Sequence, residues 1–196
     1  MGPKYEFTDE TIKFCNCILH RIRRLSDGKL GGFIEKEENL SQDGNCWVDD
    51  NAKVWGDAQI RDNAQIFGKS LINDNAQVYG NAEVYGEARI FDNARVYDDA
   101  EIGGWVEISG NARIYEEAGV GCCARIWDNA KIHGNADIDG HPEIYENAEI
   151  YGNAKIREAE IYGDSVICGD AAVGYWAELD NDKTKINGKH IQSGLW

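Results

Sequence analysis

The chain has 196 residues, of which 20 are basic and 35 acidic, and its formal net charge is −15. A charge of this sign repels nucleic acid and anionic membranes, so we expect neither as a direct partner. The sequence has no apolar run of the roughly 18 residues that a membrane-spanning helix needs. Its first residues, MGPKYEFTDE, include no apolar stretch typical of a secretory signal. We therefore expect a cytoplasmic protein.

Residues 1–45 are expected to form an N-terminal capping segment. Within it, Ile18–Leu25 alternates imperfectly between apolar and polar residues, which predicts a strand, alone or paired with Lys13–Cys17. The open end of a stacked β structure is a sheet edge that invites aggregation, and a strand pair would cover it.

A six-residue repeat dominates the rest of the chain. Aliphatic residues recur every six positions from Val48 to Ile156 without a break, and a small residue, usually Ala, stands two positions before each. Ala-x-Val/Ile places two residues on one side of a short strand. Gly-Asn, Asp-Asn or Gly-Asp pairs follow, and these residues tolerate the positive φ of a tight corner. Each repeat is therefore predicted to be one short strand and one corner.

Three such repeats close a triangular coil of about 18 residues, and the coils stack as parallel strands about 4.8 Å apart. We predict a β-helix of about eight coils over residues 46–182, followed by a tail or cap over residues 183–196. The step from Ile156 to Ile161 is five residues instead of six, which predicts one short corner.

This pattern resembles the hexapeptide-repeat family, whose fold is the all-β, left-handed parallel β-helix. LGGFIE at residues 30–35 and NLSQDGNCWV at residues 39–48 resemble the segment that opens the coils of YdcK-like proteins. These are uncharacterised proteins of bacteria, phages and prophages. The resemblance implies the handedness of the coil, and for a phage-encoded chain it implies the host cytoplasm as the location.

Six cysteines are present, and no paired C-x-x-C elements of the kind that bind zinc. We expect reduced thiols and no bound metal, with Cys168 pointing outward. No cofactor is expected either.

Sorting outward residues at steps of 18 brings aromatic and basic residues onto one face. The candidate binding residues on this face are Tyr79, Arg95, Tyr97, Arg113, Tyr115, Lys131 and His133. Tyr and Arg are enriched at the centres of interfaces. Three interpretations stay open: rings that stack only for stability, an interface between copies in a dimer or trimer, or a binding face for another molecule.

Carboxylates gather at the corners and form a second candidate surface. Its residues are Asp57, Asp74, Asp92, Asp98, Asp99, Glu116, Glu117, Asp128 and Glu146. Asp is a good corner residue on its own, so solvated corners are one interpretation. The other is a row of charges that mimics a polyanion.

The family resemblance also implies an alternative, an acyltransferase that uses acyl-CoA at a site between subunits with a His as general base. His133 is the best placed of the four histidines, since the others lie in the cap, at a corner and in the tail. The unbroken register leaves no inserted loop to build a pocket, and small-molecule sites are concave.

We therefore expect a non-catalytic, rigid binding protein that blocks or bridges another protein. The net charge favours a partner with a basic surface, and the resemblance to phage proteins suggests an inhibitor of a host defence or nucleic-acid-binding protein.

Overall fold

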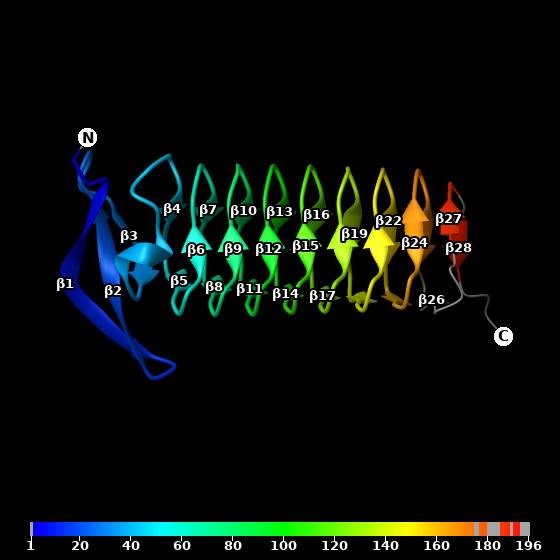
Figure 1. Ribbon diagram of the computed structural model, residues 1–196, viewed down its shortest axis with the longest axis horizontal. Helices are drawn as coiled ribbons and strands as arrows, with labels where there is room; N and C mark the ends of the chain where they lie inside the picture. Colours follow the sequence, from blue (N-terminus) through cyan, green and yellow to red (C-terminus); the bar gives the residue numbers. More distant parts are fainter. Residues whose placement is uncertain (1, 175–176, 180–184, 189, 193–196) are drawn as a thin grey trace.

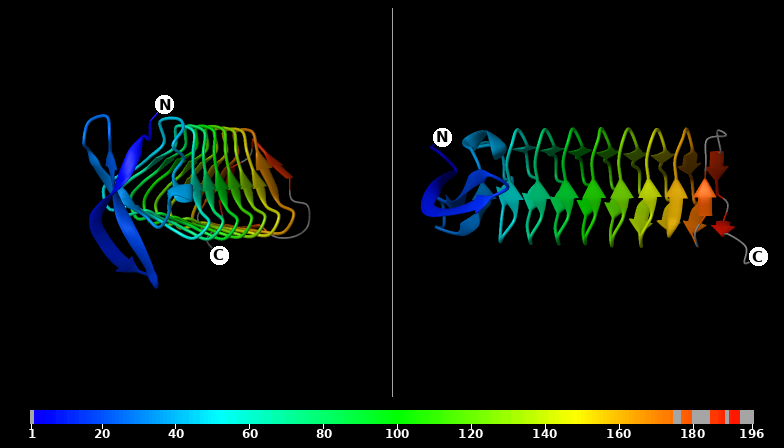
Figure 2. Two further views of the ribbon diagram at one scale, coloured as in Figure 1. Left: turned by 60° about the vertical axis from the view of Figure 1, so that its left-hand side comes forward. Right: turned by 90° about the horizontal axis from the view of Figure 1, so that it is seen from below.

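In the computed structural model, which describes residues 2–174, 177–179, 185–188 and 190–192, the chain forms a parallel β-solenoid of about eight turns. An N-terminal hairpin lies across one end, and the stacked coils run away from it (Figures 1 and 2). The predicted all-β parallel β-helix is confirmed. No helix in these residues has the length and apolar character needed to cross a bilayer.

Sheet A holds the hairpin and one strand from each coil, in the order β1-β2-β3-β5-β8-β11-β14-β17-β20-β23-β26. Its strands are β1 (Tyr5–Phe14), β2 (Cys17–Arg24), β3 (Leu30–Ile34), β5 (Lys53–Val54), β8 (Leu71–Ile72), β11 (Arg89–Ile90), β14 (Glu107–Ile108), β17 (Arg125–Ile126), β20 (Glu143–Ile144), β23 (Ala159–Ile161) and β26 (Ala177–Leu179).

The other two sheets contain only strands of the coils. Sheet B comprises β6 (Gln59–Ile60), β9 (Gln77–Val78), β12 (Arg95–Val96), β15 (Arg113–Ile114), β18 (Lys131–Ile132), β21 (Glu149–Ile150), β24 (Val166–Cys168) and β27 (Lys185–Asn187). Sheet C comprises β4 (Trp47–Val48), β7 (Gln65–Ile66), β10 (Glu83–Val84), β13 (Glu101–Ile102), β16 (Gly119–Val120), β19 (Asp137–Asp139), β22 (Lys155–Arg157), β25 (Ala172–Gly174) and β28 (His190–Gln192).

The register follows the six-residue repeat. Val96 pairs with Val78 on one side and with Ile114 on the other, so strands one coil apart are 18 residues apart in sequence. Between Ile144 and Ile161 the step falls to 17 residues, as the shortened corner predicts. Every side chain therefore stands directly above its counterpart in the previous coil.

The core is the dry interior of this prism. The Val and Ile columns and the Ala columns are all buried, and Ile114 and Ala112 have exposed fractions of 0%. Burying one Val or Ile side chain contributes about 1.5–3 kcal/mol. No single repeat could gain this alone, so stability comes from stacking.

The YdcK-like opening segment has a clear structural role. A Cβ at Gly31 would lie 2.6 Å from the Trp47 ring, and one at Gly32 would lie 2.6 Å from the Ala52 carbonyl oxygen, so both positions require glycine. The buried Asn39 amide donates to the carbonyls of Gly56 and Ala58. These contacts close the first coil.

The first coil begins earlier than the expected boundary at residue 46. Strand β3 (Leu30–Ile34) already pairs in parallel with β5, and Leu40 bridges Ile60. Leu40 and Val48 are eight residues apart instead of six, and this irregular spacing hid the first coil from the repeat pattern.

The hairpin β1–β2 covers this end of the core, as predicted. It turns at Cys15 and Asn16, whose φ values of 46° and 66° suit a tight two-residue turn. Strand β1 reaches back to Tyr5, which is buried with Ile22 in the core. The strand that pairs with β2 is therefore longer than the predicted partner, Lys13–Cys17.

At the other end, β27 and β28 continue the stack within residues 183–196, so part of the expected tail is solenoid. Residues 183–184, 189 and 193–196 of the expected tail lie outside the described residues. Cys168 follows the inward Ile167 and continues the outward column of Tyr151, as expected, but it is buried there.

Candidate functional site

Sheet B carries a continuous column of stacked rings, which we call the ring ladder: Tyr79, Tyr97, Tyr115, His133 and Tyr151. The ring centroids of Tyr97 and Tyr115 are 5.0 Å apart with planes 1° apart, and those of Tyr115 and His133 are 4.6 Å apart. Flat parallel strands hold identical positions in register, so rings one coil apart stack face to face. The aromatic candidates therefore lie together in one column.

Stacking determines which part of each ring a partner could reach. The faces of Tyr97 and Tyr115 are covered by their neighbours, and partial burial together with nearby charges raises the pKa of both hydroxyls. Only the ring edges and the hydroxyl groups remain at the surface. The edge of an aromatic ring is its electropositive part, which favours anions.

The first ring of the ladder is covered by a cation. The Arg61 guanidinium lies 4.6 Å from the centroid of the Tyr79 ring and also donates to Gln77. At the other end, a hydrogen bond with Cys168 raises the pKa of Tyr151. Both ends of the ladder are therefore held by local contacts.

Three cations form a second column beside the ladder, and we call Arg95, Arg113 and Lys131 the basic stripe. Arg113 is the Cα partner of both Arg95 and Lys131, so like charges stand directly opposite each other in adjacent strands. All three side chains are exposed. Like charges in such positions are destabilising, so the fold gains nothing from this column by itself.

The basic stripe is also uncompensated. Within the part of the chain that the structure describes, none of its three residues forms an ion pair or hydrogen bond through its side chain. The nearest carboxylate along the column belongs to Glu149, opposite Lys131, but its Oε1 lies 3.3 Å from Nε2 of His133. The stripe is thus left with free donors.

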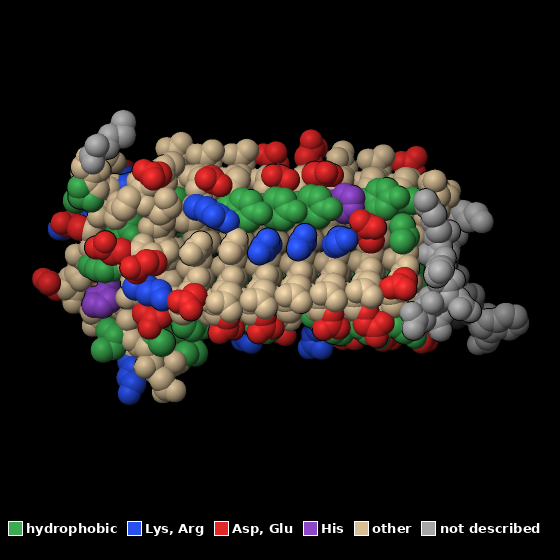
Figure 3. Space-filling view, viewed as in Figure 1, with side chains coloured by type: hydrophobic (Ala, Val, Ile, Leu, Met, Phe, Trp, Pro, Cys, Tyr) green, Lys and Arg blue, Asp and Glu red, His purple; other side chains and the backbone are tan. Residues whose placement is uncertain are grey.

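The ring ladder adds donors to the stripe. The described residues offer no acceptor to the hydroxyls of Tyr79, Tyr97 and Tyr115, whereas Tyr85 donates to Glu101 at 2.6 Å. Arg113 is among the charges that act on both the Tyr97 and Tyr115 hydroxyls. Figure 3 shows the two columns side by side on one open face, the rings as a green row with one purple His and the cations in blue.

His133 is enclosed within the ladder. Its ring is stacked between Tyr115 and Tyr151, its side chain is 18% exposed, and its two nitrogens lie near Glu149 and Glu116. A general base must reach its substrate within hydrogen-bond distance. The surroundings of His133 suit a structural member of the ladder better than a base.

The corner carboxylates largely serve the fold. Asp74, Asp92, Asp98, Glu116 and Asp128 each accept a hydrogen bond from the backbone N–H of the residue one coil further on. These corners have positive φ, and a carboxylate that bridges to the next coil fixes them. Their hydrogen bonds show that corner chemistry explains much of this acidic surface.

The sequence pattern groups some of these corner residues in one column, but the structure arranges two of them differently; the column is Asp57, Asp74, Asp92, Asn111, Asp128 and Glu146. Gly56, not Asp57, stands over Asp74, and Asp57 pairs with Lys36 at 2.6 Å. Asn111 belongs to a ladder of amides between Asn93 and Asn129 rather than to the acidic column. The expected column combined the first corner residue of some repeats with the second corner residue of others. The sequence pattern allows this because both corner residues of each repeat are polar.

Other members of the acidic set stay at the surface. Asp99 accepts from Asn81 at 2.8 Å, and Glu117 and Glu146 are exposed. In the described residues, no group of three or more His, Cys, Asp or Glu side chains is placed to hold a metal ion.

Sequence reasoning missed one surface. Trp105 is 67% exposed and lines a hollow of about 490 Å³ along sheet A. Sorting the corner residues, and not only those that follow Val or Ile, at steps of 18 would have shown that Trp105 shares a column with Lys69, Glu87, Cys123 and His141.

The comparison with known families agrees with this geometry. The family described as YdcK Beta solenoid repeat matches residues 88–104. The match spans β11, β12 and β13 and includes Arg95 and Tyr97, and it confirms the resemblance to YdcK-like repeats. No curated protein matches the chain.

Proposed function

We propose that the chain is a non-catalytic binding protein that blocks or bridges a partner protein by holding an acidic segment of it along sheet B. The basic stripe supplies the charge, and the exposed edges and hydroxyls of the ring ladder supply a rigid wall beside it. The observation that carries the proposal is the uncompensated column of Arg95, Arg113 and Lys131.

The physical case rests on cost and preorganisation. A column of like charges destabilises the fold, and an anionic segment laid along it would remove that repulsion. The coils hold the donors in place, so binding would require little ordering of this chain. Donors repeat at about 4.8 Å along the axis, so an anionic segment laid along it would meet several cations in succession.

The net charge of −15 shapes how such a partner would bind. The acidic corners border the face, so a segment displaced sideways from the stripe would meet repulsion. Charge arranged in this way contributes to orientation and specificity more than to affinity.

A partner with a basic surface would instead use the exposed corner carboxylates. That interpretation, including mimicry of a polyanion, has less support, because many of those groups are already hydrogen-bonded to the next coil. The acyltransferase alternative depends on His133, whose ring faces are covered.

The test is affinity capture with three baits from the lysate of a bacterial host, with mass spectrometry of what is retained. The baits are the wild type, the stripe variant Arg95→Gln/Arg113→Gln/Lys131→Gln, and the control Arg23→Gln/Lys69→Gln/Lys155→Gln. The control removes the same number of positive charges from other surfaces.

The proposal predicts a partner that the wild type and the control retain and the stripe variant loses. If the stripe variant keeps the partner and Asp99→Asn/Glu117→Gln/Glu146→Gln loses it, the partner binds the acidic corners and the proposal is wrong. If no protein is captured but acetyl-CoA binds in calorimetry, the transferase alternative takes its place.

A further inference from the structure

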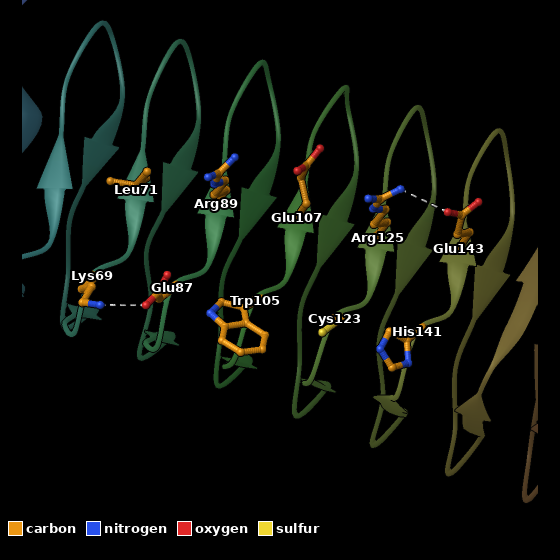
Figure 4. A pocket seen from close by; sticks show the side chains of 10 residues that line it. All are labelled: Lys69, Leu71, Glu87, Arg89, Trp105, Glu107, Cys123, Arg125, His141 and Glu143. Atoms are coloured by element: carbon orange, nitrogen blue, oxygen red, sulfur yellow. Dashed lines mark hydrogen bonds and ion pairs between the residues drawn. The ribbon is translucent and has the colours of Figure 1, made fainter. Parts of the chain in front are cut away.

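A groove runs along the outer face of sheet A, on a different side of the prism from the basic stripe. Its two hollows, of about 490 and 400 Å³, share Leu71, Arg89 and Glu107. Figure 4 shows two rows of side chains here: a floor row that starts at Leu71 and a corner row that includes Trp105. Phe14 of the hairpin closes the groove at the N-terminal end.

The floor row alternates in charge. In order along the axis it reads Lys53, Leu71, Arg89, Glu107, Arg125, Glu143, Glu160 and Glu178, and strand pairing places each directly above the last. Arg125 and Glu143 form an ion pair at 3.4 Å. Arg89 and Glu107 form none within the described part of the chain. The row therefore reads positive toward the N-terminal end and negative toward the C-terminal end, with alternation at its centre.

The order of charges along the floor row is complementary to the same order read backwards, so two antiparallel copies can pair their charges. When a second copy faces sheet A with its axis antiparallel, and the two-fold axis passes between the coils of Glu107 and Arg125, Glu107 faces Arg125 of the second copy. Arg89 then faces Glu143. Further out, Leu71 faces Glu160, whereas Lys53 lies against the Phe14 ring of the hairpin, donates to the Asn51 carbonyl and takes no part in the contact. No like charges meet along the floor.

The parallel arrangement and the antiparallel one moved by a single coil lack this property. In a parallel pair each residue faces its own counterpart, so Arg89 meets Arg89 and Glu107 meets Glu107. An antiparallel pair moved by one coil brings Arg89 opposite Arg125. The charge pattern thus selects the antiparallel orientation, because like charges in contact cost several kcal/mol. An antiparallel pair moved by two coils, with the axis between the coils of Arg89 and Glu107, also avoids like charges, but it forms fewer opposite-charge contacts than the axis between Glu107 and Arg125.

We infer that sheet A binds a second copy of this chain, antiparallel, with the two-fold axis between the coils of Glu107 and Arg125. The interface is isologous, with the same patch on both copies. It is independent of the ligand proposed for sheet B.

Trp105 supports this position of the axis. Of the large hydrophobic side chains that are exposed in the described residues, it is the only one beyond the first coil, since Ile18 and Leu25 lie in or beside the hairpin and Leu30 lies in β3. Trp105 stands one coil before Cys123, so the inferred axis passes between these two residues and each Trp105 faces Cys123 of the other copy. Exposed Trp at the centre of an interface is typical of a binding hot spot.

The charges on sheet B do not pair between two antiparallel copies, so sheet B does not suit contact with a second copy as sheet A does. Its column reads Gln59, Gln77, Arg95, Arg113, Lys131 and Glu149. Reversal about the centre of this column places Arg95 opposite Arg113, and reversal about Arg113 places Arg113 opposite itself and Arg95 opposite Lys131. A second copy would repel along this face. The face suits a foreign anion, and sheet A suits the chain itself.

The test is the molar mass in solution, by sedimentation equilibrium of the full chain over a range of concentrations. The wild type is expected at twice the 21.9 kDa of one chain. The swap Arg89→Glu/Glu107→Arg keeps the net charge but places like charges together at four contacts, and should weaken dimerisation roughly 100-fold or more. Trp105→Ala should weaken it as well, whereas Tyr97→Ala on sheet B should leave it unchanged.

A fully inverted variant separates the orientations. Arg89→Glu/Glu107→Arg/Arg125→Glu/Glu143→Arg keeps the alternation within the chain, so it should fold and form its own dimer. Mixed with wild type, every central pair becomes like-charged in the antiparallel dimer, and mixed dimers should be absent. A parallel dimer would favour the mixed species instead.

Three outcomes would overturn the inference: a wild type that is monomeric up to its solubility limit, a swap variant whose dimer is as strong as that of the wild type, or mixed dimers between wild type and the inverted variant. Far-ultraviolet circular dichroism and a thermal melt of each variant show whether it is folded, so a misfolded variant is not taken as support.

Discussion

Arg95 and Arg113 face each other as Cα partners across adjacent parallel strands, and neither has an anion beside it in the described part of the chain. Directly opposed like charges destabilise a sheet by about 0.2–1 kcal/mol. The pair therefore indicates a surface arranged for something other than stability, since stabilising residues are commonly absent where function needs another side chain.

Arg113→Gln should raise the free energy of unfolding by several tenths of a kcal/mol, up to about 1, because it removes two repulsive contacts. Urea denaturation at low salt measures the change. Arg125→Gln is the matched control, since Arg125 pairs with Glu143 and its loss should not stabilise. A destabilised Arg113→Gln variant would show that the stripe supports the fold.

The ring ladder should contribute to stability through its ring faces and to binding through its hydroxyls. Tyr97 stacks on both Tyr79 and Tyr115, so Tyr97→Ala should cost about 1–3 kcal/mol, at 0.5–1.5 kcal/mol for each stacked pair. Tyr97→Phe keeps both contacts and should change the free energy of unfolding by less than about 0.5 kcal/mol. Equal losses for the two variants would contradict a stacking role.

The core column predicts a graded series at one position. Ile114 is fully buried between Val96 and Ile132 of the adjacent coils. Ile114→Val should destabilise by about 0.5–1.5 kcal/mol and Ile114→Ala by about 2–5 kcal/mol, since the rigid coils cannot collapse into the cavity. Denaturant unfolding measures both values. A cost below about 1 kcal/mol for the Ala variant would mean that the interior is loosely packed.

Alkaline pH should weaken the fold partly through Tyr85. Its hydrogen bond to Glu101, with a smaller effect of burial, raises the pKa of Tyr85 from 10.0 to about 12. The folded state therefore keeps this proton longer than the unfolded state, so the contribution is complete below pH 10 and is lost as pH rises toward about 12.

Ultraviolet titration of tyrosine ionisation, with urea unfolding across the same range, checks this effect. Tyr85→Phe should reduce the loss of stability over this range, and Glu101→Gln should lower the pKa of Tyr85 toward its ordinary value. A loss of stability as steep in Tyr85→Phe as in wild type would contradict the assignment.

The sequence was sufficient for most of the fold because one short period sets the coils after the first. Val96 and its equivalents predict the core, and the five-residue step to Ile161 predicts the short corner. The repeat pattern did not predict the first coil because the step from Leu40 to Val48 is eight residues instead of six. Glycines and the buried Asn39 close this coil in place of a regular repeat.

For the site, the columns on sheet B were predictable and their physical state was not. Steps of 18 place Tyr97 with Tyr115 and Arg95 with Arg113. Only the structure shows that Glu149 turns to His133 and leaves Lys131 unpaired, and that Asp92 accepts the N–H of Gly110. Whether a charged group is free or engaged depends on rotamers, which a repeat pattern does not specify.

The most direct measurement is calorimetric binding of poly-L-glutamate to the wild type, to Arg95→Gln/Arg113→Gln/Lys131→Gln and to the control Arg23→Gln/Lys69→Gln/Lys155→Gln, at low and physiological salt. A chain of net charge −15 should repel this polymer unless a dedicated anion site is present. The proposal predicts binding by wild type and control that weakens with salt, and none by the stripe variant. No binding by wild type, or equal binding by all three, would contradict it.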